Sequence, residues 1–98
     1  MITNKKEQRE EAQSVLNDAE QQITSLRKRF KHSRPKTNGG TLRNLLNTVE
    51  GLLNQLIELK TTRPSVYEFH PDIREQRFSA EISCRLFIAD IETKIASS

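Results

Sequence analysis

The segment TLRNLLNTVEGLLNQLIEL, residues 41–59, places apolar residues at the spacing of an α-helix. A first stripe has spacings of four, three, four and three residues, and a second stripe lies beside it. The first consists of Leu42, Leu46, Val49, Leu53 and Leu56, and the second of Leu45, Leu52, Ile57 and Leu59. A face this wide needs two neighbours to cover it. The segment therefore predicts a helix over residues 41–61 that packs against two others.

Two residues of this helix have a local interpretation. Thr41 stands where an N-cap is expected, because its hydroxyl can accept a hydrogen bond from a free N–H of the first turn. Gly51 falls inside the segment, where glycine costs about 1 kcal/mol relative to alanine. Its presence there suggests that another backbone passes close by.

Upstream, residues 4–33 are predicted to form the first helix of the chain. Asn4 and Glu7 have the spacing of a capping box. Pro35 disfavours helical geometry in the residue before it, so the helix should end near Ser33. Apolar residues with spacings of four and three follow the heptad pattern of a coiled-coil seam. They are Ala12, Leu16, Ala19, Ile23, Leu26 and Phe30.

Downstream, the segment TTRPSVYEFHP, residues 61–71, contains two prolines and breaks the helical pattern. Between the prolines lie three apolar residues, Val66, Tyr67 and Phe69. We expect this segment to cross one end of the bundle and to plug it with these side chains.

A third helix is predicted over residues 71–96. Glu81 with Arg85, and Asp90 with Lys94, are opposite charges four residues apart in the favourable order, which supports a helix over a strand. Apolar residues continue at helical spacing to the end of the segment. They are Ile73, Phe78, Ile82, Cys84, Phe87, Ile88, Ile91 and Ile95.

Together these segments predict an all-α fold for residues 1–98, a single domain built as a three-helix bundle or long helical hairpin with heptad seams. Helices of roughly 30, 20 and 25 residues would be about 45, 30 and 38 Å long. Because these lengths differ, the first helix should extend beyond its neighbours or pair with a second copy. A homodimer formed through its seam is therefore expected.

Composition limits the location of the protein. The single cysteine, Cys84, excludes an intramolecular disulfide and fits a reducing compartment. No apolar stretch approaches the roughly 18 residues that cross a membrane, and the N-terminal residues lack the apolar core of a secretory signal. A cytoplasmic protein without a membrane partner is expected.

The sequence offers no side-chain set for catalysis, which needs a nucleophile, an acid–base pair or a metal site. The two histidines, His32 and His70, each lie beside a proline-marked break, without a Cys, Asp or Glu at metal-ligand spacing. Cys84 lies on an apolar face and is expected to be a buried, unreactive thiol. We therefore expect no enzyme, cofactor, metal site or small-molecule substrate.

The segment RKRFKHSRPK, residues 27–36, holds six cations and no acidic residue. Removing these six from the net charge of +3 leaves −3 for the other 88 residues, so the basic character is local. Compensation of the helix dipole accounts for one or two cations, worth about 0.3–1 kcal/mol. The others repel one another unless a polyanion neutralises them, which points to nucleic-acid phosphates. A nuclear-import signal and a solvated or protein-binding helix end are the alternatives.

Residues 41–66 are similar to the central helix and following turn of the insect nodavirus RNA-silencing suppressors. The residues that carry the resemblance are Leu42, Leu46, Val49, Leu53, Leu56 and Ile57, followed by Pro64, Ser65 and Val66. The resemblance implies a dimer of helical hairpins that lies along double-stranded RNA and shields it from the silencing machinery.

The sequence thus predicts a non-enzymatic protein that contacts an RNA or DNA backbone without sequence preference. The predicted phosphate contacts are Arg27, Lys28, Arg29, Lys31, Arg34, Lys36 and Arg43. The alternative is a helical protein-interaction or oligomerisation module, an adaptor or accessory subunit whose first helix docks on a partner helix.

Overall fold

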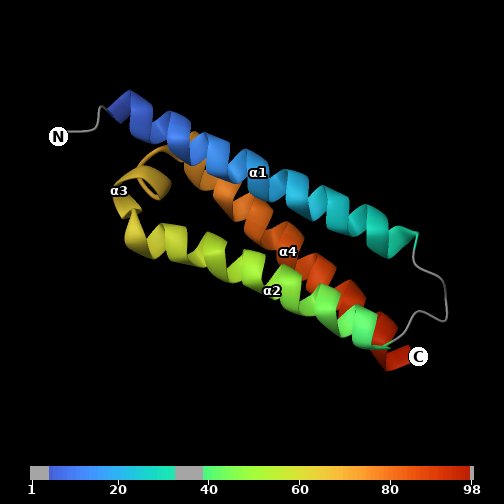
Figure 1. Ribbon diagram of the computed structural model, residues 1–98. Helices are drawn as coiled ribbons and strands as arrows, with labels where there is room; N and C mark the ends of the chain where they lie inside the picture. The colour runs from blue at the N-terminus through green and yellow to red at the C-terminus, as the bar shows by residue number, and fades with distance from the viewer. Residues whose placement is uncertain (1–4, 33–38, 98) are drawn as a thin grey trace.

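Three long helices and one short helix form the structure, a computed structural model that describes residues 5–32 and 39–97 (Figure 1). Helix α1 spans Lys5–Lys31, α2 Gly39–Thr62, α3 Pro64–Tyr67 and α4 Pro71–Ser97. No residue in these two described ranges forms a strand, so the predicted all-α class is confirmed. The bundle is elongated and measures 52 × 22 × 19 Å.

The three long helices lie side by side along the long axis of the molecule (Figure 1). Helices α1 and α4 run in the same direction and α2 runs against them, because the chain reverses after α1 and again around α3. Helix α4 packs against both α1 and α2, whereas α1 and α2 meet along little of their length. Helix α4 is therefore the central element of the core.

The helices lie where the sequence predicts them, with differences at their ends. The predicted ranges 4–33, 41–61 and 71–96 correspond to α1, α2 and α4. Helix α2 begins at Gly39, so Thr41 lies within it, and the N-cap prediction for Thr41 is wrong. The predicted ends Asn4 and Ser33 lie outside the described residues.

The three long helices are nearly equal in length. They contain 27, 24 and 27 residues, which corresponds to about 40, 36 and 40 Å at 1.5 Å per residue. The expectation that α1 is much longer than its neighbours is wrong. A difference in helix length therefore gives no reason to expect a homodimer through α1.

The predicted apolar positions of α1 and α2 pack inside a single chain. The side chains of Leu16 in α1 and Val49 in α2 have no exposed surface, and burial of such a side chain contributes about 1.5–3 kcal/mol. The other buried or partly buried members of the predicted stripes are Ala12, Ala19, Ile23, Leu26, Phe30, Leu42, Leu45, Leu46, Leu52, Leu53, Leu56 and Leu59. The core of this chain thus uses the same positions that were predicted as seams.

Gly51 faces open space on the exposed side of α2. Beyond its own helix backbone and chain neighbours, no atom lies within 4 Å of the position that a Cβ would take there. The expectation that a second backbone approaches Gly51 is therefore wrong. Nothing in the structure explains a glycine at this position.

Four residues expected in the apolar interior are exposed. Phe69 is 77% exposed and Phe78 56%, while Ile82 and Ile57 are 40% and 37% exposed. Their prediction as interior residues is wrong. Phe78 and Ile82 are exposed because the core uses another face of α4, formed by residues that include Ile73, Cys84 and Ile91. Ile57 lies on the exposed side of α2, and Phe69 lies in the segment between α3 and α4.

The short helix α3 closes one end of the bundle. Val66 and Tyr67 are 5% and 2% exposed, so two of the three predicted plug residues are buried, and Phe69 is not. Burial raises the pKa of the Tyr67 hydroxyl above its ordinary value. The side chain of Arg63, the residue before α3, pairs with Glu11 of α1 at 3.3 Å.

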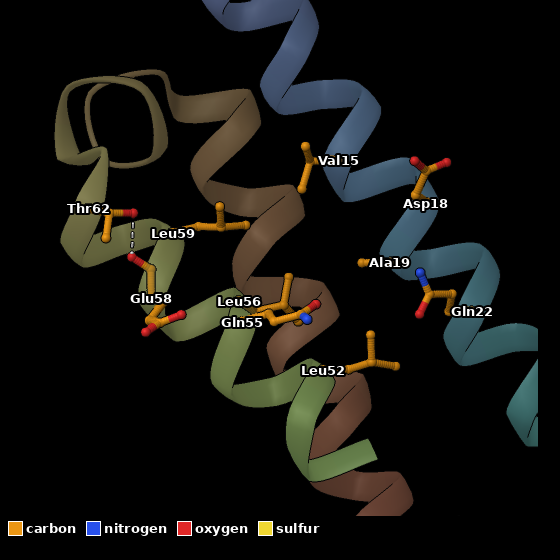
Figure 2. A pocket seen from close by; sticks show the side chains of 10 residues that line it. All are labelled: Val15, Asp18, Ala19, Gln22, Leu52, Gln55, Leu56, Glu58, Leu59 and Thr62. Carbon is orange, nitrogen blue, oxygen red and sulfur yellow. Dashed lines mark hydrogen bonds between the residues drawn. The ribbon is translucent and has the colours of Figure 1, made fainter. Parts of the chain in front are cut away.

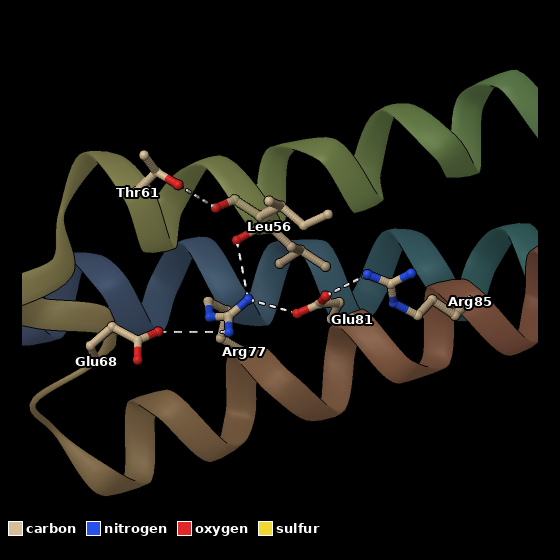
Figure 3. A network of polar contacts seen from close by, with 7 residues as sticks. Leu56, Thr61, Glu68, Arg77, Glu81 and Arg85 are labelled. Carbon is tan, nitrogen blue, oxygen red and sulfur yellow. Dashed lines mark hydrogen bonds and ion pairs between the residues drawn. The ribbon is translucent and has the colours of Figure 1, made fainter.

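A buried arginine joins α4 to α2 and to the segment after α3 (Figure 3). Arg77 is 3% exposed; its Nη1 donates to Glu81 Oε2 at 2.8 Å and to the carbonyl oxygen of Leu56 at 3.4 Å. Its Nη2 lies 3.8 Å from Glu68 Oε1. Glu81 also accepts a hydrogen bond from Arg85 at 2.8 Å, which confirms the predicted Glu81–Arg85 pair.

Candidate nucleic-acid interface

One end of the bundle gathers most of the predicted phosphate contacts. The end of α1, the start of α2 and the end of α4 lie together there (Figure 1). The last turn of α1 carries Lys28, Arg29 and Lys31, and the first turn of α2 holds no acidic residue. The sequence contains neither Asp nor Glu from residue 27 to residue 49. We call this region the basic end; its acidic residues come from α4, which carries Asp90 and Glu92 in its later turns.

Arg27 has a structural role within the chain. Its Nη2 lies 3.6 Å from Asp90 Oδ2 of α4, and its guanidinium sits over the Phe87 ring at 5.4 Å from the centroid. About half of the Arg27 side chain, 46%, remains exposed. Because Asp90 faces Arg27, part of this cation's charge is already compensated.

An aromatic pair fixes the end of α1 on α4. The rings of Phe30 and Phe87 meet edge to face, with centroids 5.5 Å apart and an interplanar angle of 68°. The ammonium group of Lys94 lies 5.2 Å from the centroid of the Phe30 ring. Such pairs contribute about 0.5–1.5 kcal/mol beyond area burial. The contact therefore helps to hold the last turns of α1 against α4.

The cations of α1 face two different grooves. Arg27, Lys28 and Lys31 line a groove of about 480 Å³ between α1 and α4. The groove also contains the hydroxyl-bearing residues Thr24 and Ser83 and the carboxylate of Asp90, which pairs with Arg27. Phosphate oxygens accept hydrogen bonds from such hydroxyls as well as from cations.

Arg29 faces the other side of α1. It lines a groove of about 440 Å³ toward α2, together with residues that include Ser25 and Thr48. The predicted cations therefore surround the end of α1 and do not form one flat patch. Arg43 is exposed on α2, while Arg34 and Lys36 lie outside the described residues.

A separate, mostly apolar groove of about 360 Å³ runs between α1 and α2 (Figure 2). Its apolar residues include Val15 of α1 and Leu52 and Leu59 of α2, while Asp18 and Glu58 place carboxylates along it. This groove exists because α1 and α2 each pack more closely against α4 than against each other.

Sequence reasoning missed two features of the site region and its surroundings. The first is the burial of Arg77, although Arg77 and Glu81 have the i, i+4 spacing of a helical ion pair. The second is an exposed apolar stripe on α4, of which Leu86, 59% exposed, is a member. Leu86 also lines the α1–α4 groove at the basic end.

The other predicted chemical features are simple to place. Cys84 is fully buried, and burial raises the pKa of its thiol to about 11. His70 precedes α4 and its carbonyl oxygen accepts a hydrogen bond from the N–H of Arg74. Among residues 5–32 and 39–97, no three His, Cys, Asp or Glu side chains gather closely enough to hold a metal ion. In the same part of the chain, no helix combines the length and the apolar character needed to cross a membrane.

Comparisons with models of known protein families, with curated proteins and with solved structures found no significant match for this chain.

Proposed function

We propose that the basic end binds the phosphate backbone of a nucleic acid without sequence preference. The observation that supports this most directly is the segregation of charge. Lys28, Arg29, Lys31 and Arg43 are exposed at one end of the bundle, in a stretch of sequence that contains no acidic residue. Cations concentrated in this way attract a polyanion and steer it to the surface.

The proposed contacts follow from the grooves. Lys28 and Lys31 bind phosphates in the groove between α1 and α4, and the hydroxyls of Thr24 and Ser83 add hydrogen bonds. Arg29 contacts the backbone from the other side of α1. Arg43, exposed near the start of α2, extends the same surface. These contacts position a backbone but read no base, so affinity would vary little with sequence.

Double-stranded RNA is the specific ligand that the similarity of residues 41–66 to nodavirus silencing suppressors implies. A silencing suppressor of this kind would read the A-form backbone and its 2′-hydroxyls by shape. Parallel titrations of RNA and DNA duplexes of equal length distinguish specific binding of double-stranded RNA from general binding of a nucleic-acid backbone. A clear preference for RNA supports the silencing role, and equal affinities support the general one.

The test is a titration of a labelled duplex of about 20 base pairs at several salt concentrations. Replacing Lys28 and Lys31 with Gln should reduce the slope of log K against log salt by about 1.8, since each phosphate contact contributes about 0.9. The matched control replaces Lys60 and Arg74, two exposed cations near the end of α2 and the start of α4. These two helix ends lie at the opposite end of the bundle (Figure 1). This control removes the same charge and should leave the slope unchanged.

Two results would overturn the proposal. The first is an affinity for both duplexes no better than about 10⁻⁴ M without a salt slope. The second is an equal loss of slope in the two double variants, which would show that only the net charge matters.

A second candidate function is a protein-interaction module, favoured by the apolar groove between α1 and α2 (Figure 2). Its apolar residues and its two carboxylates, Asp18 and Glu58, fit an amphipathic helix that carries Lys or Arg beside its apolar face. Titration with a synthetic Leu/Lys amphipathic helix, followed by NMR, should shift signals of Val15 and Leu59. Shifts spread over the whole surface, Ile57 included, would count against this candidate.

A further inference from the structure

Helix α4 carries an exposed apolar stripe on the side opposite the core. Phe78, Ile82 and Leu86 are 56%, 40% and 59% exposed, and their spacing of four residues places them one above another along the helix. The core face of the same helix includes Ile73, Ala80, Cys84, Phe87 and Ile91. Helix α4 is thus apolar on two sides, and only one of them is covered within the chain.

The residues around the stripe are small and uncharged near Ile82 and Leu86 on one side, while the exposed charges of Glu75 and Arg85 flank it on the other. Ser79 and Ala89 are exposed and lie on the same side of α4 as Ile82. Long charged side chains would hinder the close approach of a second helix, and small residues allow it. Clustered aromatic and aliphatic side chains on an exposed surface mark an interaction site.

We propose that this stripe joins two copies of the chain, with their α4 helices antiparallel and Ile82 at the two-fold axis. In this register, a residue a given number of positions before Ile82 lies opposite the residue of the partner subunit that is the same number of positions after Ile82. Phe78 therefore packs on Leu86 of the partner subunit, and Leu86 on Phe78 of the partner subunit. A two-fold interface needs a surface that is complementary to itself, and this stripe meets that requirement.

The charges at the two ends of the stripe also favour a second copy of the chain, packed in the antiparallel direction. Arg74 lies eight residues before Ile82, and Asp90 lies eight residues after it. The antiparallel register places Arg74 opposite Asp90 of the partner subunit at both ends of the interface, where Asp90 would be shared between Arg74 and Arg27 of its own chain. A parallel pairing would place Arg74 against its own copy, and like charges in contact disfavour that arrangement.

This dimer differs from the one expected from the sequence. The apolar face of α1 is used within the chain, so the interface moves from α1 to α4. The two basic ends would lie at opposite ends of the dimer, because each flanks the later turns of its own α4 (Figure 1). The inference does not rest on nucleic-acid binding, and its tests contain no nucleic acid.

Three large side chains from each subunit make a small interface, below the roughly 1,200 Å² of stable complexes. The expected dimer is therefore weak, with a dissociation constant on the order of 10–100 µM. Sedimentation velocity over a concentration series up to about 200 µM should show a concentration-dependent shift from monomer to dimer. A monomer throughout that range would overturn the proposal.

A matched pair of substitutions tests the surface. Ile82→Lys places two ammonium groups at the two-fold axis and should raise the dissociation constant at least tenfold, equivalent to about 1.4 kcal/mol. Ile57→Lys is the control, because Ile57 is the same residue type with a similar exposure, 37% against 40%, but lies on α2. Dissociation by the control and not by Ile82→Lys would place the interface elsewhere and overturn the proposal.

Cysteine cross-linking tests the register. Ile82→Cys should form a disulfide-linked dimer under mild oxidation, because position 82 meets its own copy. Phe78→Cys alone should not cross-link, but a mixture of Phe78→Cys with Leu86→Cys should. The native thiol of Cys84 is buried, which keeps background reaction low. Efficient cross-linking of Phe78→Cys to itself would indicate a parallel pairing and contradict the antiparallel register.

Discussion

Arg77 donates a hydrogen bond from Nη1 to Glu81 Oε2 at 2.8 Å, and both side chains are largely buried, 4% and 14% exposed. Arg85 binds the other oxygen of the same carboxylate at the same distance, but its side chain is 58% exposed. Glu81 therefore binds two arginines at the same distance, one of them buried and the other exposed to solvent (Figure 3).

Replacing Arg77 with Ala should destabilise the fold by about 3 kcal/mol, because it breaks a buried ion pair. The change also leaves the Leu56 carbonyl without this donor and Glu68 without its nearby cation. Arg85→Ala is the matched control and should cost no more than about 0.5 kcal/mol, since exposed pairs contribute little. Urea unfolding followed by circular dichroism measures both. Equal losses would show that burial does not determine the strength of these contacts.

Stability should fall in acid partly through Glu81. The hydrogen bond from Arg85, and then that from Arg77, lowers the pKa of the Glu81 carboxyl below its ordinary value of 4.5. A pKa lowered by folding means that the ionised carboxylate stabilises the fold. This contribution is fully present above the ordinary pKa and is lost as the pH falls through the folded-state value.

The measurement is the urea midpoint at about pH 7, 5, 4 and 3. Glu81→Gln should weaken the protein at neutral pH, because Arg77 loses its charged partner, but should make the midpoint fall less in acid. Glu92→Gln, which changes an exposed acid on the same helix, should follow the parent protein. The Asp72 carboxyl, whose pKa is lowered by its hydrogen bond with Arg9, accounts for some of the remaining acid dependence. If Glu81→Gln and the parent lose stability in parallel, Glu81 is not the responsible group.

Gly51→Ala should raise the free energy of unfolding by about 1 kcal/mol. The added methyl group meets no other part of the chain, and alanine loses less backbone entropy in a helix than glycine does. Urea unfolding of the variant should show a higher midpoint with an unchanged slope. A lower midpoint would contradict the open space that the structure shows around position 51.

The Cys84 thiol should not react with Ellman's reagent in the native protein at neutral pH. It is fully buried, and its pKa is raised to about 11 because burial disfavours the thiolate. In urea at concentrations that unfold the chain, one thiol per molecule should react quickly. Rapid reaction of the folded protein would show that α4 opens locally without global unfolding.

The positions of the long helices follow from the sequence by itself. Apolar residues at spacings of three and four indicate a helix wherever it packs, because the period belongs to the backbone. Most buried positions of α1 and α2 could be predicted for the same reason, with Ile57 of α2 as the exception. The local charge of residues 27–36 was equally readable, because a count of charges needs no fold.

Only the tertiary structure decided which apolar side of α4 is covered. Its sequence has apolar residues on two sides, so periodicity alone could not separate buried Phe87 from exposed Phe78. The burial of Arg77 likewise depends on α2 and on the segment after α3, which supply the Leu56 carbonyl and Glu68. These outcomes come from contacts between residues far apart in the chain, and a local pattern contains no information about which distant elements will meet.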